Sequence, residues 1–173
     1  SLPLAVGAYM LAPQFMHLLY GERNEAASPI FQILIWVVPF MYASEFLGYV
    51  VIVKGLERKG VRSLLISTAC NVLINLFLVP RYGYYAAAVV TVVTEIVLVL
   101  QYLWLLRDEL RHFNIGMVLL RPLIVAACTA IAILVTGSLP FVASVAAGVA
   151  VTMLALLALK LIGKQELRLI RPR

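Results

Sequence analysis

Long apolar runs, separated by short polar connections, make up most of the chain. They lie at about 2–20, 31–53, 63–79, 84–106, 118–136 and 139–159. As a helix rising roughly 1.5 Å per residue, each run is about long enough to cross a hydrocarbon core of roughly 30 Å. The pattern therefore predicts an all-α fold, a polytopic transmembrane helical bundle of about six spans over residues 1–162. A basic tail, 163–173, follows the bundle.

The stretch from Ser63 to Gln101 is typical of a transmembrane helical hairpin, because two apolar runs are joined by a tight connection, Pro80–Tyr85. Side chains four residues apart lie on one face of a helix. Each run then presents one small or polar face, made in the first run of Ser63, Ser67, Asn71 and Asn75 and in the second of Gly83, Ala87, Thr91 and Glu95. We expect these two faces to meet within the hairpin.

Two carboxylates, Glu45 and Glu95, lie deep within apolar runs. Tyr42 and Tyr49 lie at helical spacing around Glu45. A charged side chain at the centre of a bilayer costs roughly 2.5–3.5 kcal/mol on insertion scales, so both carboxylates should face protein or a watery cavity. For Glu45 three interpretations stay open: a hydrogen bond to a tyrosine or another helix, a place on a substrate or ion pathway, and an error in the boundary of the run.

The predicted site is a polar, partly hydrated face near the middle of the membrane. Its candidates for a substrate or ion pathway are Glu45, Asn71, Asn75 and Glu95, with Tyr42, Tyr49, Ser67 and Thr91 as a supporting polar face. A carboxylate in this setting can exchange a proton, or bind sodium together with other oxygen ligands. The static alternative is that Glu95 bonds Asn71 or Thr91 merely to hold the hairpin. No cofactor is predicted beyond proton or sodium coupling.

Composition and charge place the chain in a membrane. Hydrophobic residues make up 64% of it and charged residues 13%, far from the roughly 45–50% and roughly 25% of soluble domains. The net charge is +6, yet twelve of the 14 Lys and Arg residues lie in 54–62, in 107–121 and in 160–173. This alternation indicates a positive-inside topology with a cytoplasmic carboxy terminus, and it argues against nucleic acid as a partner. Gly21–Ser28 and Pro80–Tyr85 are then expected outside.

Residues that would support an enzyme are scarce. Cys70 and Cys128 lie inside apolar runs, and neither His17 nor His112 has a second metal ligand at a useful spacing. The sequence also has no phosphate-binding loop and no nucleophile elbow. We therefore predict that the chain is not an enzyme and holds no metal centre.

The central hairpin carries a family resemblance. Its pattern of an Asn, then Asn-Leu and Pro, then Gly and small residues with Thr, is formed by Asn71, Asn75, Leu76, Leu78, Pro80, Gly83, Ala87, Ala88 and Thr91. It resembles the signature of polysaccharide and lipid-linked oligosaccharide flippases, in the MATE-like multidrug/oligosaccharidyl-lipid/polysaccharide transporter superfamily. The resemblance covers roughly residues 1–110, while the last two runs match only as generic apolar helices.

The resemblance implies the second bundle of a carrier that moves polyprenyl-diphosphate-linked glycans across the cytoplasmic membrane by alternating access. Some relatives couple this movement to proton or sodium gradients. Because the chain begins at Ser1 directly in an apolar run, we expect it to be the carboxy-terminal part of such a protein. Its partners would be membrane lipid, the glycan-bearing lipid and the missing amino-terminal half.

Three alternatives stay open. A multidrug exporter of the same superfamily would share the fold. A non-transporting membrane assembly subunit would also be basic inside, but it has less reason to keep two deep carboxylates and an Asn pair. A membrane-embedded glycan-handling enzyme would be expected to carry a large outer loop with Arg or His, whereas the outer connections here are short.

Overall fold

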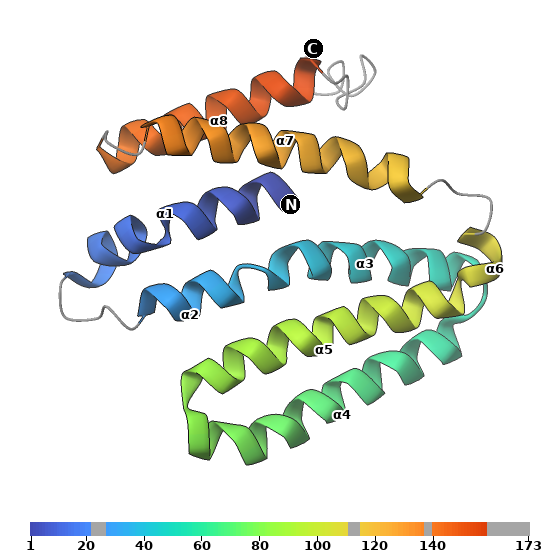
Figure 1. The fold of residues 1–173 in the computed structure, drawn as a ribbon. Coiled ribbons are helices and arrows are strands. Elements are labelled where there is room, and N and C mark those ends of the chain that lie inside the picture. Colours follow the sequence, from blue (N-terminus) through green and yellow to red (C-terminus); the bar gives the residue numbers. More distant parts are fainter. Residues whose placement is uncertain (22–26, 111–114, 137–139, 159–173) are drawn as a thin grey trace, which may run out of the picture. The chain divides into compact units, whose positions relative to one another are not determined.

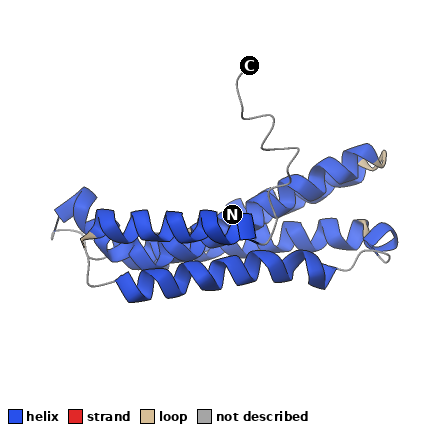
Figure 2. Ribbon diagram, turned by 90° about the horizontal axis from the view of Figure 1, so that it is seen from above, coloured by secondary structure: helices blue, strands red, loops and turns tan. Residues whose placement is uncertain are grey.

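A computed structural model describes residues 1–21, 27–110, 115–136 and 140–158. These residues form helices joined by short loops, with no strand among them (Figures 1 and 2). The all-α class predicted from the apolar runs is confirmed. The predicted basic tail, 163–173, lies outside the described residues.

The helices divide into two compact units, and the division falls within α1 (Leu2–Tyr20), just ahead of Pro13. The first unit contains Ser1 and Ala12–Asn114, and the second contains Leu2–Leu11 and Ile115–Arg173. All of the predicted site residues belong to the first unit. Each unit has its own packing.

In the first unit, α5 (Tyr84–Leu105) is the central helix. It packs against the three helices that precede it and the one that follows it, which are α2 (Ala27–Leu34), α3 (Val37–Val53), α4 (Glu57–Tyr82) and α6 (Arg107–Leu110) (Figure 1). A buried cluster joins the α3 and α5 ends nearest the α3–α4 connection, formed by Leu47, Val51, Leu98, Tyr102 and Leu106. This cluster fixes the part of α3 and α5 on which the candidate site is built.

The predicted run 31–53 is not one continuous helix, because the chain breaks between α2 and α3 at Ile35 and Trp36. Pro39 has no backbone N–H, so it cannot donate to the carbonyl four residues earlier, which belongs to Ile35. That carbonyl instead accepts a hydrogen bond from the Val38 N–H at 3.2 Å. The break therefore follows from a proline whose presence the sequence shows, but whose effect on the helix the apolar pattern alone does not.

The turn of the hairpin is shorter than predicted. The proposed connection Pro80–Tyr85 is wrong, because α4 continues through Pro80 to Tyr82 and α5 begins at Tyr84. Gly83 alone joins the two helices, with φ at 64°, a conformation that favours glycine. Its N–H bonds the Val79 carbonyl at 2.8 Å and so closes the end of α4.

The basic end of the first unit is held by contacts between side chains. The Lys54 Nζ lies 2.6 Å from the Glu109 Oε2, which ties the end of α3 to α6. The Arg107 guanidinium lies over the Trp104 ring, 5.3 Å from its centroid. Gly60, in the first turns of α4, packs so closely on Val51 that an added Cβ would lie 2.7 Å from the Val51 Cγ1.

The second unit packs small and hydroxyl residues of α7 (Ile115–Thr136) and α8 (Phe141–Ala158) together with the first part of α1. The Thr129 and Thr152 hydroxyls meet at 2.7 Å. A Cβ added to Gly148 would lie 3.4 Å from the Ile133 side chain. This close approach is the kind that small residues permit between membrane helices.

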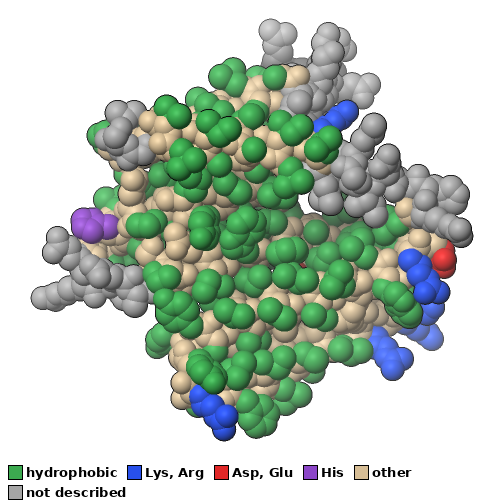
Figure 3. Space-filling view, viewed as in Figure 1, with side chains coloured by type: hydrophobic (Ala, Val, Ile, Leu, Met, Phe, Trp, Pro, Cys, Tyr) green, Lys and Arg blue, Asp and Glu red, His purple; other side chains and the backbone are tan. Residues whose placement is uncertain are grey.

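The described helices have the surface of a membrane protein. Five of them are long and apolar enough to span a bilayer: Leu2–Tyr20, Ala27–Val53 with its break, Glu57–Tyr82, Tyr84–Leu105 and Phe141–Ala158; a further apolar helix, Leu120–Thr136, is shorter. Apolar side chains cover the visible faces of the helices, while the Lys and Arg side chains gather at helix ends (Figure 3). These features indicate a multi-pass membrane protein.

Candidate functional site

A ladder of polar side chains joins α4 to α5 within the hairpin. The Asn71 Nδ2 donates to the Thr94 Oγ1 at 2.8 Å, and the Asn75 Nδ2 donates to the Asn71 Oδ1 at 3.0 Å. Two helical turns from Thr94 along α5, and about one turn from Asn71 along α4, the Gln101 Nε2 donates to the Ser67 Oγ at 3.2 Å. Residues of the α4 face predicted from the spacing of four therefore make these hydrogen bonds. Their partners on α5 are Thr94 and Gln101.

The end of this ladder nearest Gly83 is incompletely bonded. The Asn75 Oδ1 is buried and has no hydrogen-bond partner among the described residues. Thr91, expected on the same face as Glu95, donates its hydroxyl to the Ala87 carbonyl of its own helix at 2.8 Å. Thr91 is thus bonded within α5, while Asn75 still offers an acceptor.

Glu95 faces a different helix from its neighbour Thr94. Successive residues of an α-helix are turned by roughly 100°, and the Glu95 carboxylate accepts a hydrogen bond from Ser44 of α3. Ser44 is 5% exposed. The pairings considered from sequence, Glu95 with Asn71 or Thr91, are therefore not those in the structure, because Asn71 bonds Thr94 and Thr91 bonds its own backbone.

The Ser44 hydroxyl has two neighbouring oxygens. Besides the Glu95 Oε1, the carbonyl of Met41 lies 3.0 Å from the Ser44 Oγ. A serine hydroxyl carries one hydrogen, so it can donate to only one of these oxygens at a time, while its lone pairs remain free to accept. The chemistry of Ser44 therefore depends on whether Glu95 is ionised.

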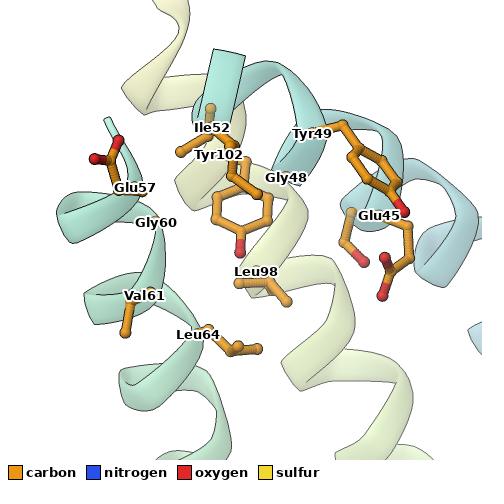
Figure 4. A pocket seen from close by; sticks show the side chains of 12 residues that line it. Glu45, Gly48, Tyr49, Ile52, Glu57, Gly60, Val61, Leu64, Leu98 and Tyr102 are labelled. Atoms are coloured by element: carbon orange, nitrogen blue, oxygen red, sulfur yellow. The ribbon is translucent and has the colours of Figure 1, made fainter. Parts of the chain in front are cut away.

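A groove of about 400 Å³ opens beside Ser44, between α3 and α4 and over α5. Its polar lining consists of Ser44, Glu45, Tyr49, Glu57 and Tyr102. In Figure 4, Glu57 at the start of α4 and Glu45 on α3 lie on opposite sides of the groove, with the Tyr102 ring between them in that view. The rest of the lining is apolar or glycine and includes Val61 and Leu64 of α4.

The two deep carboxylates occupy different settings. Glu45 is exposed to the groove and makes no hydrogen bond or ion pair with a described residue, whereas Glu95 is partly buried and bonded to Ser44. Counted along their helices from Val53 and Leu105, they lie about 12 Å and about 15 Å from the basic end. Both depths are near the middle of a hydrocarbon core of roughly 30 Å.

The supporting tyrosines lie on the exposed side of α3. Tyr42 is 62% exposed and Tyr49 is 68% exposed, and only Tyr49 lines the groove. Tyr102, which the sequence analysis did not include in the site, is a groove residue within electrostatic reach of both Glu45 and Glu95. Its place near the end of the run 84–106 is also typical of an interfacial aromatic side chain.

Ser44, Thr94 and Gln101 are the other site residues missing from the sequence prediction. Each is a hydroxyl or amide residue within an apolar run, and Ser44 and Thr94 directly precede the two carboxylates in the chain. That adjacency is a signal in the sequence. It does not show which neighbouring helix each side chain faces, and this assignment required the structure.

The fold and the site together define a multi-pass membrane protein with a polar network between its spanning helices. Among the described residues, no group of three or more His, Cys, Asp or Glu side chains is placed to hold a metal ion. Comparison with models of known protein families, with curated proteins and with solved structures finds no match to this chain. The resemblance of the hairpin to the flippases therefore stays a prediction from the sequence.

Proposed function

We propose that the chain is the carboxy-terminal part of a membrane carrier that flips lipid-linked oligosaccharide or polysaccharide precursors across the cytoplasmic membrane by alternating access. The observation that carries the proposal is the polar network at mid-membrane depth, where Glu95 is bonded to Ser44 and Asn71 to Thr94. Ionisable residues within spanning helices are rare, and they commonly mark substrate or ion pathways.

Helix packing alone does not account for this network. Small residues bring membrane helices together without any carboxylate, as Gly148 does in the second unit. The first unit instead keeps one carboxylate on the wall of a groove and another behind it, at a cost of roughly 2.5–3.5 kcal/mol for each charged group. The glycan part of the proposal rests on the resemblance of the hairpin to the flippases.

The proposed orientation places the Lys54–Arg62 end in the cytoplasm and Gly83 outside. Lys59 and Tyr84 are exposed at these opposite ends of α4 and α5. With Cys70 and Cys128 replaced by alanine, an impermeant thiol reagent added to intact cells should label Tyr84→Cys and spare Lys59→Cys. The reverse labelling pattern would overturn the orientation.

The described helices supply one bundle of the proposed carrier. Transporters built from repeats move one bundle against another around a central site. Residues 1–173 reconstituted alone should therefore give no glycolipid translocation. Robust activity of this piece would show that it is sufficient without an amino-terminal half.

The function is tested in proteoliposomes containing the full-length protein and a fluorescent polyprenyl-diphosphate-linked oligosaccharide. Glu45→Gln and Glu95→Gln should each lower the rate of translocation and change its dependence on pH or sodium. Thr152→Val is the control, because Thr152 bonds within the second unit. Export of cationic dyes without glycolipid movement would favour the multidrug alternative, and normal transport in both glutamine variants would end the proposed role of the carboxylates.

A further inference from the structure

The groove beside Ser44 has properties that the proposed carrier does not yet explain. It begins near Glu57, the first residue of α4 at the basic end, and reaches Glu45 about 12 Å deeper along α3. No Lys or Arg lines it, although basic residues are abundant at that end of the unit. The groove is therefore acidic where its surroundings are basic.

We propose that this groove is a water-filled entry path for protons from the basic side of the membrane, and that Ser44 relays the proton to Glu95. The proposal rests on the carrier function and adds an entry side, a relay residue and a coupling ion. An exposed carboxylate at the depth of Glu45 is expected to face water within the protein, because facing lipid costs several kcal/mol. A cleft lined by one sign of charge also concentrates ions of the other sign.

Ser44 is the residue that joins the groove to Glu95. It lines the groove, whereas Glu95 is not among the lining residues. With Glu95 ionised, the Ser44 O–H donates to the Glu95 carboxylate. With Glu95 protonated, the carboxyl O–H donates to the Ser44 Oγ, and the Ser44 O–H donates to the Met41 carbonyl at 3.0 Å. The Ser44–Glu95 hydrogen bond is thus kept in both protonation states with the same positions of the oxygen atoms.

The transfer is balanced. A hydronium ion in the groove gives one proton to the Ser44 Oγ, and Ser44 passes its original proton to the Glu95 carboxylate. The hydronium becomes water, the serine remains a neutral hydroxyl and the carboxylate becomes a carboxyl group. Release toward the groove is the same sequence in reverse.

The groups around this path suit a proton better than a metal ion. The titratable side chains near Glu95 are Glu45 on α3 and Tyr102 on α5, with Tyr49 and Glu57 further along the groove. From α4, the described side chain that bonds α5 at the level of Glu95 is the Asn71 amide. The described bond to Glu95 comes from one hydroxyl, whereas a metal ion needs several oxygen ligands.

The water-filled groove is tested by thiol labelling of the full-length protein lacking Cys70 and Cys128. Leu64 and Ile66 form a matched pair on α4, because both are 47% exposed and only Leu64 lines the groove. From the basic side, a small cationic methanethiosulfonate should label Leu64→Cys and leave Ile66→Cys unlabelled. It should also react about tenfold faster than its anionic counterpart, and Glu57→Gln should reduce this preference. Equal labelling of the two cysteines, or no preference for the cation, would overturn the proposal.

The relay is tested by the infrared absorption of the protonated Glu95 carboxyl group, assigned through its loss in Glu95→Gln. Ser44→Ala should shift this band and slow its response to a pH jump, and Ser44→Thr should restore both. An unchanged band and response in Ser44→Ala would overturn the relay.

The identity of the ion is tested by replacing choline with sodium at constant ionic strength. This exchange should leave the labelling rate of Leu64→Cys unchanged, and protection of the cysteine by sodium would indicate that the groove binds a metal ion in place of the proton. None of these measurements requires transport, so they remain decisive even if the glycan assignment fails.

Discussion

The two units of the chain differ in the kind of polar residue that bonds another helix. In the second unit, the hydroxyls of Thr129, Thr136 and Thr152 each donate to a carbonyl four residues earlier in the same helix, at 2.7–2.9 Å. In the first unit, Asn71, Gln101 and Ser44 bond side chains of other helices. A hydroxyl bonded to its own backbone needs no partner helix, whereas an amide or carboxylate within a membrane does.

This difference distinguishes the second unit, where polar residues accompany helix packing, from the first unit, which holds the candidate site. The threonine hydroxyls of the second unit keep an acceptor when the helices part, since the backbone of their own helix supplies it, whereas Ser144 of α8 donates to the Thr136 carbonyl of α7. The polar groups of the first unit lose their partners if α3, α4 and α5 separate, unless water replaces them. The first unit should therefore be the part of the chain in which stability depends on specific contacts between helices.

The largest predicted effect concerns the closest packing in each unit. In Gly60→Ala the new Cβ would lie 2.7 Å from the Cγ1 of Val51, which is buried and only 1% exposed. Overpacking of this kind costs typically about 1–3 kcal/mol. Gly148→Ala places its Cβ at 3.4 Å from Ile133 and should be nearly neutral, because alanine also favours the helix by about 0.5–1 kcal/mol.

The measurement is the free energy of unfolding in mixed detergent micelles for both alanine variants. Val51→Ala combined with Gly60→Ala should recover part of the loss, because it removes the methyl group that clashes. A larger loss for Gly148→Ala than for Gly60→Ala would contradict the packing described for the two units.

The sequence predicts the helices and the candidate site to different extents. The first apolar run coincides with α1, and the run 84–106 ends one residue from α5. Both prolines can be read from the sequence, yet Pro39 accompanies a break between helices and Pro80 lies inside α4. The sequence does not distinguish these outcomes, because the backbone groups that a proline frees can be bonded by their surroundings.

The candidate site was predictable as a set of residues but not as a set of pairs. The depth of Glu45 and Glu95 and the spacing of Asn71 and Asn75 placed polar groups in the membrane. The rotation of roughly 100° between Thr94 and Glu95 sends one toward α4 and the other toward α3. Which helix lies on which side is a matter of tertiary packing, and spacing along one helix carries no information about it.

A smaller effect is expected for the polar pairs themselves. Double-mutant cycles compare Asn71→Ala and Thr94→Ala with Thr129→Ala and Thr152→Ala. Hydrogen bonds between membrane helices average about 0.6 kcal/mol and reach about 1.7 kcal/mol, and we expect the Asn71–Thr94 coupling in this range. The Thr129–Thr152 coupling should be smaller than the Asn71–Thr94 coupling, because each threonine hydroxyl keeps a carbonyl acceptor of its own helix when the other is removed. A reversed order of the two couplings would refute the contrast.

The smallest effect concerns the ion pair at the basic end. Lys54 and Glu109 are 42% and 51% exposed, and such pairs contribute about 0.2–1 kcal/mol. Lys54→Met should lower the free energy of unfolding by this amount at low salt and by almost nothing at 1 M salt, where the screening length is about 3 Å. Lys59→Met is the matched control, because Lys59 is exposed and pairs with no described carboxylate. A loss in Lys54→Met that persists at high salt would indicate a packing effect instead.

Gly83 limits how the first unit can change shape. Since a single residue joins α4 to α5, neither helix can slide along its axis without drawing the other with it. The connection from α3 to α4 is longer, runs from Lys54 to Leu56 and contains Gly55 at a φ of 68°. Spin labels at Ile66 and Val97 should accordingly keep one separation throughout the proposed transport cycle, while a label at Phe46 changes its distance to both. The hairpin of α4 and α5 would then move as one rigid body, and α3 would turn relative to it.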